Sequence, residues 1–139
     1  MNYFDMKLLA TSENEAFARN VVASFAVQCN PTIEEINDIK TAVSEAVTNC
    51  VVHAYSGSDG VVQIECRTEN NTLEISVRDF GKGITDVKEA IEPFFTTAPD
   101  EERSGMGFTI IETFMDEMSV TSAVGEGTCV RMKKVIKGC

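Results

Sequence analysis

The sequence lacks the features that are typical of membrane proteins, of secreted proteins and of disulfide-rich or zinc-binding domains. No stretch approaches the roughly 20 apolar residues needed to span a bilayer. The start, Met1–Asp5, has neither the basic segment nor the apolar run of a signal peptide. The 5 cysteines are an odd number without a C-x-x-C spacing, which argues against a disulfide framework or a zinc site. We therefore expect no membrane partner, a reducing cytoplasm, and cysteines that are mostly small buried hydrophobic residues.

Basic side chains are also scarce. The 139 residues contain 12 Lys and Arg against 22 Asp and Glu, which gives a formal net charge of −10. An acidic body repels phosphate backbones, so we expect no direct binding of nucleic acid. The same charge repels free nucleotides at long range. A nucleotide site would therefore need local backbone N–H groups, a few cations and a metal ion.

Nothing in the chain indicates more than one domain. There are no internal repeats, low-complexity tracts or linkers, and 43% apolar with 24% charged residues is an ordinary globular composition. We expect residues 1–139 to form a single domain that folds without disulfides or structural metals.

Hydrophobic periodicity and turn residues predict a specific order of elements. Helices are predicted over 13–28 and 33–55, each opened by a capping box with Ser12 or Thr32 as the N-cap, and Phe17 begins the apolar face of the first. The other predicted elements are strands at 2–10, 61–67, 73–78, 119–123 and 128–135, helices at 86–92 and 106–117, and an irregular stretch at 93–104. This order favours an α+β fold, a two-layer α/β sandwich whose mixed, mostly antiparallel sheet carries helices on one face.

Three polar residues of the second predicted helix, Glu45, Asn49 and His53, are spaced i, i+4 and i+8. This spacing places them in one stripe with neighbours about 6 Å apart along the axis. A carboxylate and an amide one turn apart can serve as general base and Mg²⁺ ligand, because Mg²⁺ favours hard oxygen donors. A solvated helix face has the same pattern, and a packing or lid contact is the simpler role for His53.

Two glycine-bearing segments follow. In residues 79–84, after a predicted strand, the glycines let backbone amides turn toward a ligand, and Asp79 can accept a hydrogen bond from an exocyclic amine. In residues 103–108, G-x-G opens a helix, which suits a phosphate, and Arg103 adds a cation. Taken singly, an ordinary turn and a glycine-assisted helix cap also explain these segments. Neither is a Walker P-loop or a Rossmann turn.

In this order and spacing, the motifs resemble the N, G1 and G2 boxes of the Bergerat-type ATP-binding fold shared by gyrase, Hsp90, histidine kinases and MutL. Within that fold the chain resembles the serine-kinase anti-sigma factors, most nearly those of sporulation. The segments that carry this resemblance are 14–19, 44–49, 95–97 and 102–110. The resemblance covers nearly the whole chain.

The resemblance implies a role for each matching residue. Glu45 would be the general base of a protein-serine kinase, and Asn49 would be the Mg²⁺ ligand. Asp79 would read the adenine amino group, with the hydroxyl of Thr128 in support. The base pocket would be lined by Gly81, Gly83 and Ile84, and the lid and phosphate cradle would be formed by Thr97, Arg103, Ser104, Gly105, Met106, Gly107 and Phe108.

The resemblance also implies partners. Relatives use ATP and Mg²⁺, bind a cognate sigma factor, phosphorylate a serine of an anti-anti-sigma protein and form homodimers, and Arg19 matches a position implicated in partner contact. Histidine kinases share the boxes but carry their acceptor histidine on an attached domain, for which this chain has no room. Two alternatives stay open: a stress-response anti-sigma kinase, and a nucleotide-gated binding module without phosphotransfer.

Overall fold

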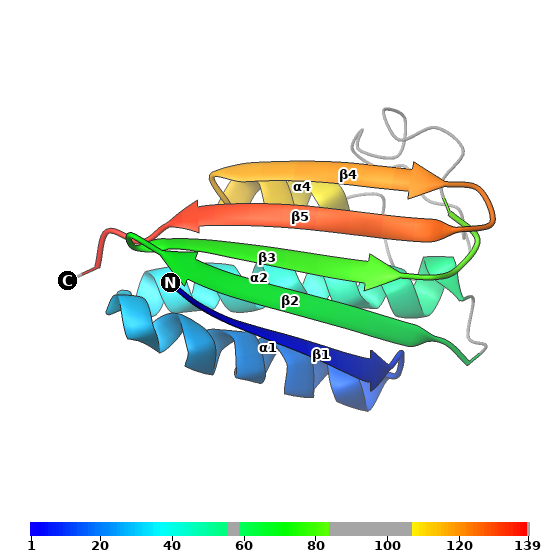
Figure 1. Ribbon diagram of the computed structural model, residues 1–139, viewed down its shortest axis with the longest axis horizontal. Coiled ribbons are helices and arrows are strands. Elements are labelled where there is room, and N and C mark those ends of the chain that lie inside the picture. The colour runs from blue at the N-terminus through cyan, green and yellow to red at the C-terminus, as the bar shows by residue number, and fades with distance from the viewer. Residues whose placement is uncertain (56–58, 84–106, 139) are drawn as a thin grey trace.

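The computed structural model of the chain describes residues 1–55, 59–83 and 107–138. They form two layers, a five-stranded sheet with helices over one of its faces (Figure 1). The strand order is β1-β2-β3-β5-β4, and each pairing in it is antiparallel. The predicted α+β sandwich is confirmed, and β1 lies at one edge of the sheet.

The elements follow the predicted order. The strands are β1 (Asn2–Leu9), β2 (Val61–Glu69), β3 (Thr72–Asp79), β4 (Glu117–Ala123) and β5 (Gly127–Val135). The helices are α1 (Ser12–Ala26), the 3-10 turn η1 (Val27–Cys29), α2 (Ile33–Asn49), the π-helix η2 (Cys50–Ala54) and α4 (Gly107–Phe114). The helix predicted at 86–92 and the irregular stretch at 93–104 lie outside the described residues.

The two predicted helix starts differ in outcome. The capping box of Thr32 and Glu35 is present, with both of its hydrogen bonds. The prediction of Ser12 as the first N-cap was wrong, because the cap is Thr11, whose hydroxyl accepts the N–H of Asn14 at 3.2 Å. The side chain of Glu15 contacts Arg19 and Ser44, as described below.

Other boundaries also differ from the periodicity. The helix predicted over 33–55 changes to π geometry after Asn49. The helix predicted to reach residue 117 ends at Phe114, because Glu117 already pairs with Lys133 in the β4–β5 ladder. Phe17 is 52% exposed and does not belong to the core, so its predicted place on the buried face of α1 was wrong. That face consists instead of small residues, namely Ala18, Val22, Ala23 and Ala26.

The core lies between the sheet and the helices. Alternate residues of β3 face it, and Leu73, Ile75 and Val77 are almost completely buried. The α2 helix packs between α1 and α4 and contributes Ile39 and Val43 to the same core. The cysteines within the described residues are free and buried, as expected: Cys29, Cys50, Cys66 and Cys129.

One buried lysine joins the two layers. The Nζ atom of Lys134 donates to the carbonyl of Phe114 at 2.8 Å and lies 3.5 Å from a carboxylate oxygen of Asp38. A cation at the carboxyl end of α4 also complements the helix dipole. This contact fixes the end of α4 against β5 and α2.

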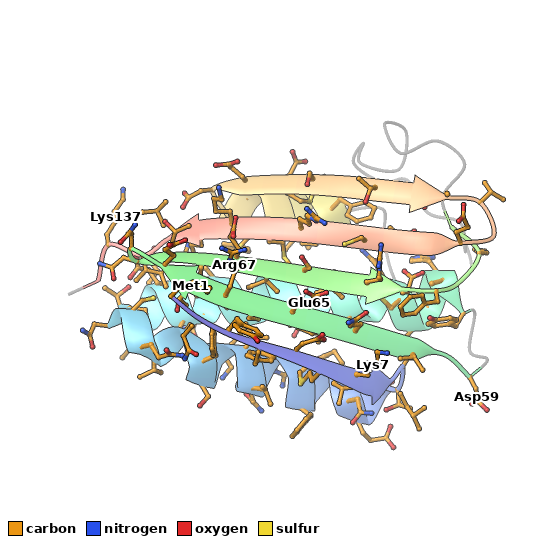
Figure 2. The ribbon with its side chains drawn as sticks, viewed as in Figure 1. Met1, Lys7, Asp59, Glu65, Arg67 and Lys137 are labelled. Atoms are coloured by element: carbon orange, nitrogen blue, oxygen red, sulfur yellow. The ribbon has the colours of Figure 1, made fainter. Side chains whose placement is uncertain are left out.

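The opposite face of the sheet carries charged side chains, as Figure 2 shows for Lys7, Glu65 and Arg67, and no helix of the described residues covers it. Glu74 lies 3.5 Å from Arg67 and 3.7 Å from Lys133, which forms an ionic ladder across three strands. None of the helices in the described part of the chain is long and apolar enough to cross a membrane.

Candidate functional site

Asp79 lies at the carboxyl end of β3, in the inward-facing row of that strand. It is 6% exposed, although its neighbours in the row are hydrophobic. Its Oδ1 atom accepts two backbone hydrogen bonds, from the N–H of Gly81 at 3.0 Å and the N–H of Thr128 at 3.2 Å. A buried carboxylate at a strand end, held by backbone donors, can act as a fixed acceptor.

Burial is the main influence on the charge of this group. It raises the pKa of the Asp79 carboxyl above its ordinary value of 3.8, while hydrogen bonds from Gly81, Thr128 and the thiol of Cys50 act in the opposite direction. Burial, followed by the negative charge of Asp79, raises the pKa of the Cys50 thiol well above its ordinary range. The thiol therefore stays protonated beside the carboxylate.

Thr128 sits opposite Asp79 in the β3–β5 register. Its backbone N–H contacts Asp79, whereas its hydroxyl oxygen lies 2.8 Å from the hydroxyl of Ser122 on β4. The supporting role expected of the Thr128 hydroxyl at the adenine amino group stays a prediction. The preceding Gly127 has φ +107°, and a Cβ at that position would lie 2.1 Å from the carbonyl oxygen of Asp79. Only glycine allows β5 to approach Asp79 so closely.

The turn after Asp79 is held between two other segments. On one side, the N–H of Lys82 bonds the carbonyl of Ala54 in η2 at 3.4 Å. On the other side, the carbonyl of Lys82 accepts the N–H of Gly125 in the β4–β5 turn at 2.8 Å. Gly83 has φ +79°, and a Cβ there would lie 2.3 Å from the carbonyl oxygen of Ala123. The predicted glycine turn is thus closely packed on both sides.

The polar stripe predicted on the second helix spans α2 and η2. Glu45, Asn49 and His53 are all half-buried. Asn49 ends α2, and its side-chain amide meets the first residue of α4, because a Cβ on Gly107 would lie 3.1 Å from both its Oδ1 and Nδ2 atoms. The first N–H groups of a helix have no partner within that helix, so donors gather beside Asn49.

The structure thus brings the expected residues together in two pairs, Asp79 with Thr128 and Asn49 with Gly107. Phe108 follows in α4 and is buried. The remaining expected site residues lie outside the described residues, namely Ile84, Thr97, Arg103, Ser104, Gly105 and Met106. The sequence reasoning did not single out Ser122 or Tyr55, since contacts between distant strands and turns leave no periodic signal.

Arg19 lies on α1, apart from these pairs. Its guanidinium contacts Oε2 of Glu15, one turn earlier, at 2.5 Å. The same oxygen accepts the hydroxyl of Ser44 on α2 at 3.1 Å. Glu15 therefore connects Arg19 to the residue just before Glu45.

Asn49 offers an oxygen atom that could hold Mg²⁺. Within 1–55, 59–83 and 107–138, no group of three or more His, Cys, Asp or Glu side chains gathers to hold a metal ion. Mg²⁺ needs no such cage, because it keeps waters and binds one or two protein oxygens together with substrate phosphates. The amide oxygen of Asn49 is a donor of the required kind.

Comparison with known proteins agrees with this arrangement. Residues 8–134 match the family model described as the histidine kinase-like ATPase domain. The chain is 57% identical to the anti-sigma F factor of Caldanaerobacter subterraneus subsp. tengcongensis over 135 residues, which cover 97% of this chain and 94% of that protein. It is 53% identical to the anti-sigma F factor of Clostridium novyi, with 98% of this chain and 96% of that protein covered.

Solved structures share the fold at low sequence identity. The crystal structure of the RsbU and RsbW domains of Rv1364c from Mycobacterium tuberculosis matches with a TM-score of 0.68 at 18% identity, over 98% of this chain and 32% of that one. The catalytic domain of the histidine kinase ThkA matches with a TM-score of 0.58 at 15% identity, over 99% and 97% of the two chains.

Proposed function

Because the chain belongs to the histidine kinase-like ATPase domain family and, within it, to the anti-sigma F factors, we propose that it is an ATP-dependent protein-serine kinase that also binds and inhibits a sporulation sigma factor. The observation that supports ATP as the ligand is the environment of Asp79. A buried carboxylate whose Oδ1 is occupied by two backbone donors can present its other oxygen to the amino group of adenine.

The second pair of residues suits the phosphates. Asn49 would hold Mg²⁺, and the N-terminal turn of α4 at Gly107 and Phe108 would donate backbone N–H groups to phosphate oxygens. When bound, Mg²⁺ supplies charge neutralisation at the phosphates. Ile84, Thr97, Arg103, Ser104, Gly105 and Met106 would complete the base pocket, the lid and the phosphate cradle.

In the proposed transfer, the hydroxyl oxygen of a partner's serine attacks the γ-phosphorus of ATP. The new serine O–P bond forms while the bond to the β–γ bridging oxygen breaks, and ADP leaves. Glu45 accepts the serine proton, because a hydroxyl of high pKa benefits from a base within hydrogen-bond reach. Its position one turn before Asn49 keeps this base near the γ-phosphate end of the nucleotide.

The proposed partners follow from the family. They are a sigma factor, an anti-anti-sigma protein that carries the acceptor serine, and a second copy of this chain in a homodimer. Arg19 is the proposed contact to a partner, and we place the protein in the cytoplasm. A stress-response anti-sigma kinase is the alternative for the pathway, and a nucleotide-gated binding module is the alternative without transfer.

The test combines the purified chain, Mg²⁺, ATP labelled at the γ-phosphate and the small anti-anti-sigma protein of the same organism. We expect label on a serine of that protein, loss of labelling with Glu45→Ala, and unchanged ADP affinity for this variant. Glu112→Ala, which removes an exposed carboxylate of α4, is the matched control. Tight nucleotide binding without any labelled partner would favour the binding module, and transfer by Glu45→Ala would exclude Glu45 as the base.

A further inference from the structure

The side chain of Tyr55 bridges two segments that are distant in the sequence. Its hydroxyl accepts the backbone N–H of Phe80 at 2.7 Å and donates to the backbone carbonyl of Val61 at 2.7 Å. Phe80 is the residue directly after Asp79, and Val61 begins β2. One phenol therefore connects the end of η2 to the start of β2 and to the turn that follows Asp79.

The surrounding backbone is fitted closely to this bridge. A Cβ on Gly60 would lie 2.4 Å from carbons of the Tyr55 ring, so the ring lies directly on that glycine. A Cβ on Gly81 would lie 2.5 Å from the carbonyl oxygen of Ala54, the residue before Tyr55. The N–H of Lys82 also bonds that carbonyl. The end of η2 thus contacts the turn through both backbone and side chain.

These contacts couple the two halves of the proposed site. The segment that ends in Tyr55 begins at Asn49, the proposed Mg²⁺ ligand, and the turn it holds begins at Asp79, the proposed adenine acceptor. A π-helix is uncommon and often marks functional positions, because it displaces the following residues from the α-helical path. The π-helix η2 places Tyr55 next to the backbone N–H of Phe80.

We propose that Tyr55 is the positioning and specificity-determining residue of the adenine pocket, which holds the Asp79 turn in register with the α2–η2 segment. It acts through the backbone of Phe80 and so is not a catalytic residue. This inference rests on the proposed function, because it presumes that Asp79 reads adenine.

The position of the Asp79 turn should affect adenine nucleotides more than guanine nucleotides. A carboxylate oxygen accepts a hydrogen bond from the amino group of adenine, whereas guanine presents a carbonyl oxygen at the equivalent position and is repelled. If the turn shifts, the contact with the base weakens while phosphate contacts persist. Loss of Tyr55 should therefore reduce the preference for ATP over GTP, and a change that only destabilises the fold should weaken both nucleotides equally.

The experiment measures ADP, ATP and GTP dissociation constants by calorimetry for the full chain and for Tyr55→Phe. This variant keeps the ring and removes the hydroxyl. We expect ADP and ATP to bind about tenfold more weakly, which corresponds to loss of about one hydrogen bond's contribution, with GTP changed less. The matched control is Tyr3→Phe, because Tyr3 and Tyr55 are the 2 tyrosines of the chain and Tyr3 is 69% exposed on β1.

A second variant tests the same contact from the other side. Gly60→Ala leaves Tyr55 and the turn chemically intact but pushes the ring aside. It should reproduce the loss of ATP preference, and the double variant should add little, since both changes break one contact. Amide hydrogen exchange at Phe80 should accelerate in both variants, because Tyr55→Phe removes the acceptor of that N–H and Gly60→Ala displaces it.

The outcomes separate the two claims. If wild type binds ADP but Tyr55→Phe keeps its ATP-to-GTP ratio, the role of Tyr55 is wrong and the proposed function stands. If wild type binds no adenine nucleotide, both are wrong. Reduced thermal stability with an unchanged ratio would identify Tyr55 as a structural residue only and would also overturn the proposal.

Discussion

Gly107 lies against the side-chain amide of Asn49, so close that an added methyl group would sit 3.1 Å from both amide heteroatoms. The contact joins the carboxyl end of α2 to the amino end of α4. A glycine at this position leaves the space that the side-chain amide of Asn49 occupies.

We therefore predict opposite effects of Gly107→Ala on binding and on stability. The methyl group displaces the Asn49 amide by a few tenths of an ångström, which should weaken Mg²⁺-dependent ATP binding by about tenfold, the effect of losing about one charge-assisted contact. Stability should stay equal or rise by up to about 1 kcal/mol, because alanine favours helix more than glycine does. Calorimetry with and without Mg²⁺, and thermal unfolding, measure the two quantities.

Thr113→Ala provides the control for Gly107→Ala, because it changes an exposed residue of the same helix without approaching Asn49. Unaltered Mg²⁺-dependent ATP binding by Gly107→Ala would show that Asn49 does not need its present position.

Asp79→Asn should change the thermal stability of the chain by an amount that depends on pH. Burial raises the pKa of Asp79, so the folded state holds its proton to higher pH than the unfolded state does. The contribution of this group is therefore most favourable below its ordinary pKa of 3.8 and is lost as pH rises through the raised value. At pH 7 the variant, which carries no buried charge, should melt at a higher temperature than wild type, and the difference should shrink toward pH 4.

The same substitution should abolish recognition of the base. The amide oxygen can still accept from Gly81 and Thr128, but the amide nitrogen then faces the adenine amino group, donor against donor. We expect no measurable ADP binding at concentrations that saturate wild type.

For the stability prediction, a difference in melting temperature between Asp79→Asn and wild type that is the same at pH 4 and pH 7 would show that the buried charge does not control the stability of this site.

Most of the fold could be predicted from the sequence because its signals are local. The period-two alternation of β2 and β3, and the capping box at Thr32 and Glu35, depend on neighbours along the chain. The errors arose where tertiary contacts decide the end of a helix or the side chains that it buries. The periodic pattern of α4 continues past Phe114. The helix nevertheless ends there, because Lys134 donates a hydrogen bond to the carbonyl of Phe114 and Glu117 pairs with β5. Phe17 fits the helical pattern, yet small residues face α2 instead.

The site shows the same division. Asp79 and Asn49 stand in recognisable motifs, so their types and spacing could be read directly. The contact between the backbone N–H of Thr128 and Asp79, and the one between the Thr128 and Ser122 hydroxyls, could not be predicted, because they depend on how β3, β4 and β5 pair. Tyr55 was missed because its partners, Val61 and Phe80, become neighbours only when the sheet has formed.

Glu35 should stabilise the chain in a pH-dependent manner. Its carboxylate accepts the N–H of Thr32 at 2.9 Å and those of Lys137 and Gly138 at 2.9 and 3.1 Å, so it caps α2 and fastens the segment after β5. These hydrogen bonds, with that from Thr32 foremost, lower the pKa of Glu35 below 4.5. Its contribution is therefore present above pH 4.5 and is lost as pH falls through the lowered value.

Glu35→Gln should reduce the free energy of unfolding at pH 7 by about 1 kcal/mol, the usual loss for a disrupted cap. The loss should shrink as pH falls through the lowered pKa of Glu35, because the wild-type carboxylate then becomes protonated itself. Chemical denaturation over a pH series from 7 downward measures it, with Glu34→Gln as control, since Glu34 is an exposed acid in the same turn. Equal losses for the two variants would mean that helix-dipole charge, and not the cap, carries the effect.

Arg19 should matter to a partner far more than to the fold. Its side chain is 37% exposed and pairs with Glu15 across one helical turn, a type of ion pair that contributes about 0.5 kcal/mol or less. If Arg19 contacts the sigma factor, Arg19→Ala should weaken that complex by about tenfold or more, as loss of an interfacial arginine often does. Lys137→Ala, which removes an equal charge at an exposed site, should leave the complex unchanged.

Glu15→Gln tests why Arg19 is held where it is. Oε2 of Glu15 binds both Arg19 and Ser44. The neutral Glu15→Gln side chain keeps an acceptor for the Ser44 hydroxyl but loses the charge that attracts the Arg19 guanidinium. We expect a smaller loss of sigma-factor affinity than with Arg19→Ala, and no further loss in the double variant, because Glu15 acts through Arg19. Fully additive losses would mean that Glu15 meets the partner directly, and the ion pair would then be a feature of the free protein alone.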